Sequence, residues 1–185
     1  MQSASFIIHA LGAADADEYQ ALRLRGMRES AESFGSTFDE DAALPLTTVA
    51  ERLSSSSENG ERIVLGAFIA NVDEVPVMIG IVGCMRESKI KLRHKAVLWG
   101  LYVAPESRGH GVGQMLIQHL LTAARTWRGL QRIVLSVVVR STAARKLYLS
   151  VGFVSFGIEH DALRQNSISD DVEMMSLDIS ASRQQ

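Results

Sequence analysis

Cysteine is almost absent from this chain, since Cys84 is the single one among 185 residues. One cysteine excludes a disulfide within the chain and cannot by itself make a zinc site. The five histidines show no metal-ligand spacing such as His-x-x-x-His, so no metal centre is predicted. Cys84 lies in an apolar run, where a small core residue in a reducing compartment is expected.

The chain also lacks a strong charge of either sign and a long apolar run. Its formal net charge is −2 and its pI is near 6.2, which excludes the basic footprint of a nucleic-acid-binding protein. No apolar stretch approaches the roughly 20 residues that span a bilayer. The first residues lack the basic and apolar regions of a signal peptide. We therefore expect a soluble, cytoplasmic protein without a nucleic-acid or membrane partner.

What the chain has is apolar material, with 46% hydrophobic residues in a length that fits one domain, residues 1–185. Segment 29–38 changes to polar and small residues with two exposed-looking phenylalanines, Phe34 and Phe38. The serine run 54–57, Asn59-Gly60 and the segment 71–74 are predicted as loops or turns. Periodicity predicts strands at 6–11, 62–70, 75–85, 97–103, 131–139, 154–164 and 170–179, and helices at 15–30, 47–53, 111–129 and 141–152.

One stretch organises the rest, running from Val97 to Ile117 as a strand, a glycine-rich turn and the start of a helix. Pro105 cannot donate to a ladder, so the strand is predicted to end near residue 104. Gly109, Gly111 and Gly113 then alternate in a loop that opens a helix. Such a loop leaves backbone N–H groups clustered at the positive end of the helix dipole. The sequence predicts an anion site, with a phosphate or pyrophosphate as the anion.

The spacing of this loop distinguishes between phosphate-binding motifs. A Rossmann fingerprint counted from Gly109 would need a third glycine at Gln114, and the Gly-Lys-Ser/Thr of a P-loop is missing. A purely structural turn remains the alternative. What fits is Arg108-x-x-Gly111-x-Gly113 after Val-Ala-Pro-Glu, which resembles the acetyl-CoA signature of the GNAT superfamily of N-acetyltransferases. The resemblance implies cofactor contacts at the strand residues Leu101 and Val103 and in the loop at Arg108, Gly109, His110, Gly111, Val112 and Gly113.

A second block, Ser141 to Phe153, strengthens this resemblance. By physics alone it is a helix that Ser141 can cap and Gly152 can end. GNAT proteins commonly have Asn-x-x-Ala-x-x-Leu-Tyr-x-x-x-Gly-Phe here, and this chain departs from that pattern with Ser141 in place of the asparagine. Ser141 therefore either keeps a weaker contact with the pantetheine arm or only caps the helix. The matching positions are Leu135, Val137, Ala144, Leu147, Tyr148, Gly152 and Phe153.

Tyr148 is the catalytic candidate. The family's matching tyrosine protonates the departing CoA thiolate, which suits a phenol that normally titrates near 10. The alternative is a tyrosine on the buried stripe whose hydroxyl bonds to the backbone. The general base is not identifiable from the sequence. Glu29, Glu40 and His160 are candidates, acting directly or through water.

The resemblance implies an α/β (α+β) fold with a mixed, mostly antiparallel twisted sheet of six to seven strands and about four flanking helices. A splayed parallel pair would hold acetyl-CoA, and an acetyl group would pass to a primary amine of a small molecule or peptide. Exposed edge strands invite a homodimer. One alternative is an acyl-CoA-binding regulatory or interaction domain without turnover. The other, a nucleotide-phosphate enzyme, lacks an acidic metal site at a useful spacing.

Overall fold

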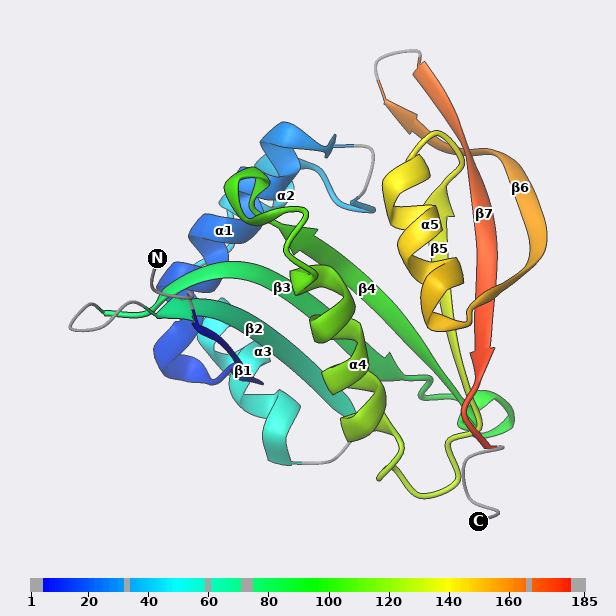
Figure 1. The fold of residues 1–185 in the computed structure, drawn as a ribbon, viewed down its shortest axis with the longest axis horizontal. Helices are drawn as coiled ribbons and strands as arrows, with labels where there is room; N and C mark the ends of the chain where they lie inside the picture. Colours follow the sequence, from blue (N-terminus) through cyan, green and yellow to red (C-terminus); the bar gives the residue numbers. More distant parts are fainter. Residues whose placement is uncertain (1–4, 32–33, 59–60, 71–74, 166–167, 181–185) are drawn as a thin grey trace.

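The computed structural model describes residues 5–31, 34–58, 61–70, 75–165 and 168–180, and its strands form one seven-stranded sheet (Figure 1). The order in the sheet is β1-β2-β3-β4-β5-β7-β6. All neighbours pair antiparallel except β4 and β5, which run parallel. The mixed sheet confirms the predicted fold class. The strands are β1 (Ser5–Ala10), β2 (Arg62–Ala70), β3 (Val77–Arg86), β4 (Lys95–Val103), β5 (Arg132–Val138), β6 (Val154–Gln165) and β7 (Ile168–Asp178).

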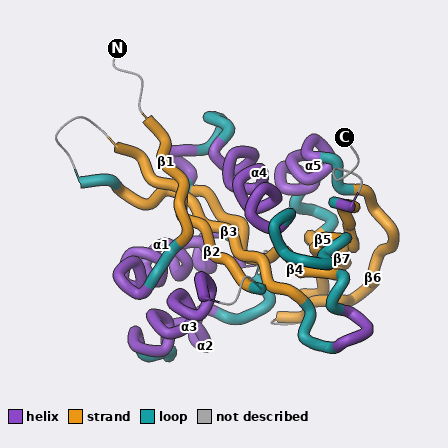
Figure 2. Tube along the Cα trace, turned by 90° about the horizontal axis from the view of Figure 1, so that it is seen from below, coloured by secondary structure: helices purple, strands orange, loops and turns teal. Residues whose placement is uncertain are grey.

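Helices cover both faces of this sheet (Figure 2). On one face α1 packs over β3 and α3 over β2, with α2 against α1, and on the other face lie α4 and α5. Each face has its own apolar cluster, and Cys84 is fully buried in the cluster beneath α4, as predicted. The helices are α1 (Ala16–Glu29), α2 (Phe38–Ala42), α3 (Leu46–Glu58), α4 (Val112–Ala124) and α5 (Thr142–Val151), with short 3₁₀ turns at Ala13–Asp15, Ile90–Leu92 and Pro105–Ser107.

The parallel pair separates soon after it forms. β4 and β5 are hydrogen-bonded only from Lys95 to Val97 on one strand and from Arg132 to Val134 on the other. Beyond these residues β4 continues with β3 and β5 continues with β7, so the two strands diverge across the molecule (Figure 1). The predicted splay is therefore present, and it divides the sheet into two halves.

A bulge lies in β4 at the place where the strands have parted. Tyr102 pairs with Ile81 and Trp99 pairs with Gly83, which leaves Gly100 and Leu101 of β4 without ladder partners. Gly100 has φ +65°, a left-handed conformation that favours glycine. A bulge of this kind bends the strand and turns its backbone away from the ladder.

Several local predictions were wrong. The serine run does not end a helix, because α3 continues through it to Glu58. Ser54 explains part of this, since its hydroxyl donates to the carbonyl of Ala50 one turn earlier, 3.0 Å away. The helix α4 ends at Ala124, before Trp127, although the Trp127 ring is still buried. The predicted turns at 59–60 and 71–74 lie outside the described residues.

The polar segment after α1 also differs from the expectation. Phe34 is buried with 7% of its surface exposed, and Phe38 begins the short helix α2. Thr37 and Glu40 form a capping box at the start of α2, a signal for a helix that polar composition alone obscures. Asp15, expected to cap α1, stands at the cap position but its side chain accepts from the Gly12 amide instead.

Candidate active site

The loop between β4 and α4 has the backbone of an anion site. Gly109 and Gly111 both have φ +79°, in the left-handed region where a side chain is strained. Gly111 is the N-cap of α4 and no side chain caps this helix end. The first amides of α4 therefore face the loop without a side-chain acceptor, at the positive end of the helix dipole. This arrangement fits a phosphate group.

A cavity of about 570 Å³, here called the loop cavity, lies between this loop and the start of α5. Every residue expected to contact the cofactor lines it except His110, which is exposed outside it. Ser141 lines the cavity and is the N-cap residue of α5, as predicted, but its side chain makes no capping hydrogen bond. The predicted residues in its wall are Leu101, Val103, Arg108, Gly109, Gly111, Val112, Gly113 and Ser141.

The third glycine of the loop has a packing role. A Cβ at Gly113 would lie 3.0 Å from Cδ2 of Leu147, tighter than ordinary contact. A larger residue there would displace the end of the Leu147 side chain. Gly113 therefore lets the first turn of α4 come close to Leu147 of α5, at the wall of the loop cavity.

A second cavity, the splay cavity, occupies about 280 Å³ between the separated strands. Tyr148 from α5 lines it, and burial raises the pKa of this tyrosine. Its ring packs edge-on against Phe153, and among the described residues its hydroxyl has no hydrogen-bond partner. The backbone partner considered as an alternative is thus not found there. Leu101, at the bulge, lines both the splay cavity and the loop cavity.

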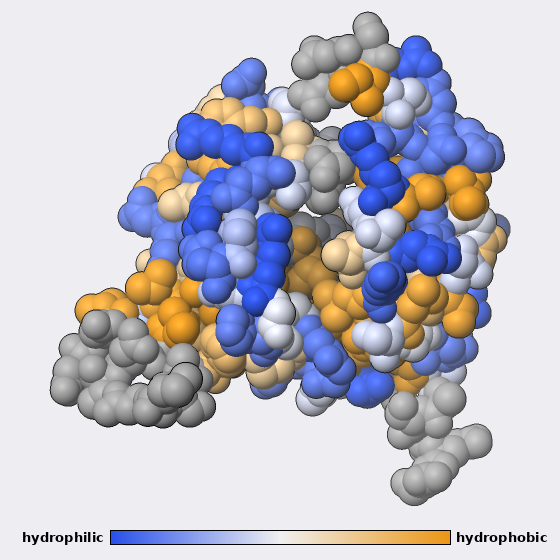
Figure 3. Space-filling view, turned by 45° about the horizontal axis from the view of Figure 1, so that its top comes forward, coloured by the Kyte–Doolittle hydropathy of each residue, from blue (hydrophilic) through white to orange (hydrophobic). Residues whose placement is uncertain are grey.

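A third cavity of about 320 Å³, the hairpin cavity, lies between residues 27–31 and 34–38 on one side and strands β6 and β7 on the other. Figure 3 shows the molecule hollowed between its two halves, with hydrophilic side chains on the rim and hydrophobic ones deeper inside. Phe34 lines all three cavities, so its ring stands where they meet. The Arg23 guanidinium makes a cation–π contact with this ring, 5.4 Å from the ring centroid.

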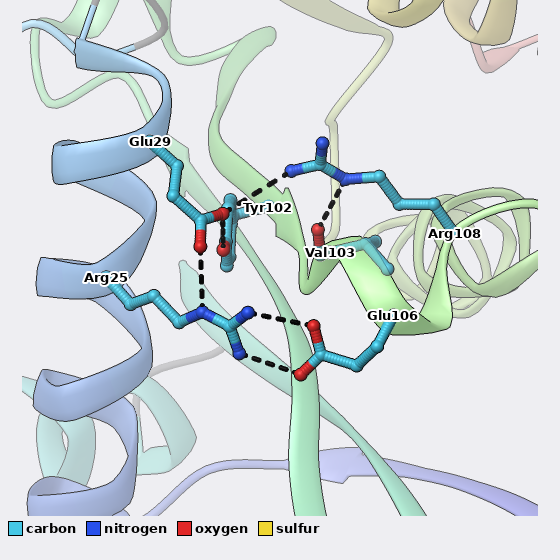
Figure 4. A network of polar contacts seen from close by, with 6 residues as sticks. All are labelled: Arg25, Glu29, Tyr102, Val103, Glu106 and Arg108. Atoms are coloured by element: carbon cyan, nitrogen blue, oxygen red, sulfur yellow. Dashed lines mark hydrogen bonds and ion pairs between the residues drawn. The ribbon is translucent and has the colours of Figure 1, made fainter.

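An ion-pair network ties α1 to the loop (Figure 4). Arg25 donates to both carboxylate oxygens of Glu106, at 2.7 and 2.8 Å, and to Glu29 at 2.9 Å. The hydrogen bonds from Arg25 lower the pKa of Glu106 to about 2. Both side chains are exposed, so the pair orients the loop rather than adding much stability. Glu106 is thus a surface residue paired with α1.

Glu29, one of the predicted bases, is occupied in the same network. The Tyr102 hydroxyl donates to it at 2.5 Å and Arg108 approaches it at 3.9 Å. The hydrogen bond from Tyr102, followed by that from Arg25, lowers the pKa of Glu29. Arg108 also donates from Nε to the Val103 carbonyl at 2.9 Å, bracing the loop against β4 (Figure 4). A carboxylate held this way is a weak base.

The other two predicted bases are also away from the splay. Glu40 accepts from the backbone N–H of Thr37, which lowers its pKa, and serves as the capping residue of α2. His160 is exposed and shares a 2.7 Å contact with Asp171. The carboxylate that lines the splay cavity together with Tyr148 is Glu159 of β6. Sequence reasoning missed it as a base, and its position one residue before His160 on an edge strand gave no signal.

Within the described part of the chain, no group of three or more His, Cys, Asp or Glu residues could hold a metal ion. No helix there is long and apolar enough to cross a bilayer. Near the meeting of the cavities lie the amides at the start of α4, the buried phenol of Tyr148 and the carboxylate of Glu159.

Comparison with known proteins supplies a family. The profile of the Acetyltransferase (GNAT) family matches residues 28–153, more than half of the chain and all of the β4–α4 loop. Among curated proteins, none matches this sequence.

Many solved structures share the fold. An acetyltransferase of the GNAT family from Streptococcus pneumoniae is 24% identical, with a TM-score of 0.80 over 95% of this chain and 100% of that one. A putative acetyltransferase from Salmonella typhimurium, solved with acetyl-CoA, is 19% identical, with a TM-score of 0.78 over 94% and 93%. Spermidine N-acetyltransferase from Vibrio cholerae, solved with CoA and spermine, is 22% identical, with a TM-score of 0.70 over 94% and 95%.

Proposed function

The chain belongs to the GNAT family of acetyltransferases, and on that premise we propose that it transfers the acetyl group of acetyl-CoA to a primary amine of a small molecule or peptide. The observation that carries the proposal is the continuity of two cavities. The loop cavity has an uncapped helix end in its wall, and the adjoining splay cavity contains Tyr148.

The loop residues hold the cofactor. The N-terminal amides of α4 and the left-handed Gly109 and Gly111 bind the pyrophosphate, and the diverging β4 and β5 leave room for the pantetheine arm. Acetyl-CoA supplies an acetyl group activated as a thioester. The amide of Leu101, at the bulge and shared by both cavities, stabilises the negative charge that develops on the carbonyl oxygen.

Tyr148 acts as the general acid. The carbon–nitrogen bond forms as the carbon–sulfur bond breaks, and the departing thiolate takes the phenol proton. Because burial raises the pKa of Tyr148, the hydroxyl keeps its proton until a thiolate develops beside it. Its free hydroxyl supports this role, since no described residue competes for the proton.

Glu159 is the candidate for the general base. The acceptor amine must be neutral to attack, and Glu159 takes its proton directly or through a water molecule. Glu159 lines the splay cavity with Tyr148, whereas Glu29, Glu40 and His160 do not. The acid lies on α5 and the base on β6, so the two proton transfers use different elements of the half that carries β5 to β7.

The experiment is calorimetric titration of acetyl-CoA into the wild-type protein and into Gly111→Asp. The aspartate adds bulk and negative charge where the pyrophosphate binds, so we expect binding by wild type and its loss in the variant. Gly129→Asp is the matched control, because Gly129 has φ +78° and an equally open Cβ position but follows the far end of α4. Loss of binding in both variants would indicate a folding defect, and no binding by wild type would sink the proposal.

Turnover separates an enzyme from a domain that only binds acetyl-CoA. Thiol release is measured with a panel of amines, with wild type beside Tyr148→Phe. Binding without thiol release from any amine would support the regulatory alternative.

A further inference from the structure

We infer that the acceptor is a carboxylated amine with an apolar side chain, such as a free hydrophobic amino acid, rather than a polyamine or a protein N-terminus. This inference rests on the proposed acetyl transfer and concerns the same site. It follows from the walls of the hairpin cavity, which meets the splay cavity at Phe34, Gly35 and Leu163.

The hairpin cavity opens toward the position of the reacting amine. Because it shares a wall with the splay cavity, a molecule seated in it has its nearest end beside Glu159 and Tyr148. Its volume of about 320 Å³ is at the low end for a small-molecule site. An amine with a short skeleton fits this space, whereas a folded protein surface does not enter it.

The charged groups at the wall of the hairpin cavity carry more positive than negative charge. Two guanidinium groups, Arg140 and Arg164, line the hairpin cavity, and each is paired with a carboxylate, Asp170 and Asp161 respectively. Among the described residues, the unpaired charge beside the wall is therefore that of Arg28. Arg28 adds a further positive charge behind the wall, 4.3 Å from the ring centroid of Phe38. The field in the cavity therefore favours an anion.

The one carboxylate in the wall, Asp170, is already ion-paired. Asp170 accepts from Arg140 at 2.7 Å, and only 13% of its side chain is exposed. A cationic tail would have to share this nearly buried carboxylate with Arg140. The arginines are different, because their side chains are 58% and 68% exposed and each has five N–H donors. Arg164 shares Nε and one terminal nitrogen with Asp161, which leaves further donors for a substrate carboxylate.

The rest of the wall is apolar. Phe34 is buried at the junction, and the other apolar side chains come from α1, α2 and the hairpin. An acceptor that satisfies both parts of the wall carries an anion for the arginines and an aliphatic or aromatic group for the remainder. The apolar residues of the wall are Met27, Ala31, Phe34, Phe38, Leu163 and Ile168.

The test compares matched acceptors that differ only in the carboxylate. L-leucine, L-methionine and L-phenylalanine are each assayed beside their amides and their decarboxylated amines, with spermidine as the polyamine. The measured quantity is kcat/KM referred to the concentration of neutral amine, which removes differences in the fraction of each acceptor that is neutral. We expect the carboxylated member of each set to be preferred by about tenfold, the scale of a charge-assisted hydrogen bond.

Variants assign the preference to the cavity. In Arg164→Gln the preference for carboxylate over amide should fall by roughly fivefold, while kcat/KM for the amide stays nearly constant. The preference for carboxylate over amide is also measured in Arg140→Gln. The KM for acetyl-CoA is measured in the same variant, because Arg140 also lines the loop cavity. Arg132→Gln is the control, since Arg132 is exposed at the paired start of β5, away from the splay.

Each outcome decides the inference. A preference for carboxylates that depends on Arg164 supports it. Equal or better use of the amides or of spermidine overturns it, as does acetyl-CoA binding without turnover of any carboxylated amine. Failure of acetyl-CoA to bind overturns this inference together with the proposed function, so the two failures are distinguishable.

Discussion

The two cavities that flank the splay are built by different means. The loop cavity is shaped by backbone, with left-handed glycines, an uncapped helix end and a glycine where α4 approaches α5. The hairpin cavity is shaped by side chains, with arginines, a paired aspartate and apolar groups drawn from α1, α2, β6 and β7. A site shaped by backbone keeps its geometry when side chains change, whereas a side-chain site can change its ligand through single substitutions.

Tyr148→Phe tests the point where the two regions meet. Removing the hydroxyl should lower kcat by about 100-fold, the lower range for a general acid, with acetyl-CoA affinity unchanged. Because the pKa of Tyr148 is raised, the wild-type rate should show no loss from its ionisation until well above pH 10. The measurement is kcat against pH for both proteins, and an unchanged kcat in the variant would remove Tyr148 from the mechanism.

Stability and acceptor binding at the hairpin cavity, whose walls are side chains, should be sensitive to Arg23→Gln. Arg23 donates to Asp41 at 2.5 Å and to Ser36 at 3.2 Å, and its side chain is 15% exposed. Its loss leaves Asp41 largely buried without its partner, which should lower the free energy of unfolding by about 2–4 kcal/mol. Phe34 also loses a cation–π contact, and because its ring lines all three cavities, the acceptor KM and the acetyl-CoA Kd should both rise, the acceptor KM by the larger factor.

Denaturant unfolding and the two constants check this expectation. The double variant Arg23→Gln/Asp41→Asn serves as the control, because removing both charges should cost less than the sum of the single changes. A larger change in acetyl-CoA affinity than in acceptor KM would contradict the separation of the two regions.

The loop that shapes the loop cavity should be destabilised by Gly109→Ala. A Cβ there meets nothing within 4 Å, so the cost comes from the φ of +79° alone, about 1–2 kcal/mol. Gly12→Ala is the matched control, since Gly12 has an equally open Cβ position but φ −124°. Thermal unfolding of the two variants isolates the backbone strain, and equal effects would refute it.

The smallest effect is expected for Glu106→Gln, which breaks the exposed pair with Arg25. The pKa of Glu106 is lowered from 4.5 to about 2 in the folded protein, so its stabilising contribution is full above pH 4.5 and is lost as the pH falls toward 2. The melting temperatures of wild type and variant should therefore differ slightly at neutral pH and converge in acid. A difference that grows below pH 4.5 would contradict the sign of this linkage.

The same contrast decides how much the sequence could predict. The strand, the glycine loop and the helix around Gly111 were predictable because their geometry depends on neighbouring residues and on the special freedom of glycine. The burial of Phe34 was not, since it depends on Arg23 and on cavity walls from distant segments. The contact of Arg25 with Glu106 joins residues 81 positions apart, and composition carries no signal for it.

The prediction of secondary structure also failed where contacts between distant segments outweigh local sequence preferences. The serines of α3 continue a helix despite their preference for loops, and the helix α2 was hidden in a polar segment. Glu159 was passed over because its approach to Tyr148 is created by the hairpin and not by spacing.

The position of Phe34 has a thermodynamic consequence. One aromatic ring forms part of the wall of all three cavities, so any ligand that shifts it changes the space offered to the others. The two substrates then share a coupling free energy, and it must be reciprocal: the factor by which acetyl-CoA alters the acceptor's dissociation constant equals the factor by which the acceptor alters that of acetyl-CoA. Such a ring makes the cooperativity between the two substrates a property of the shared wall rather than of either site.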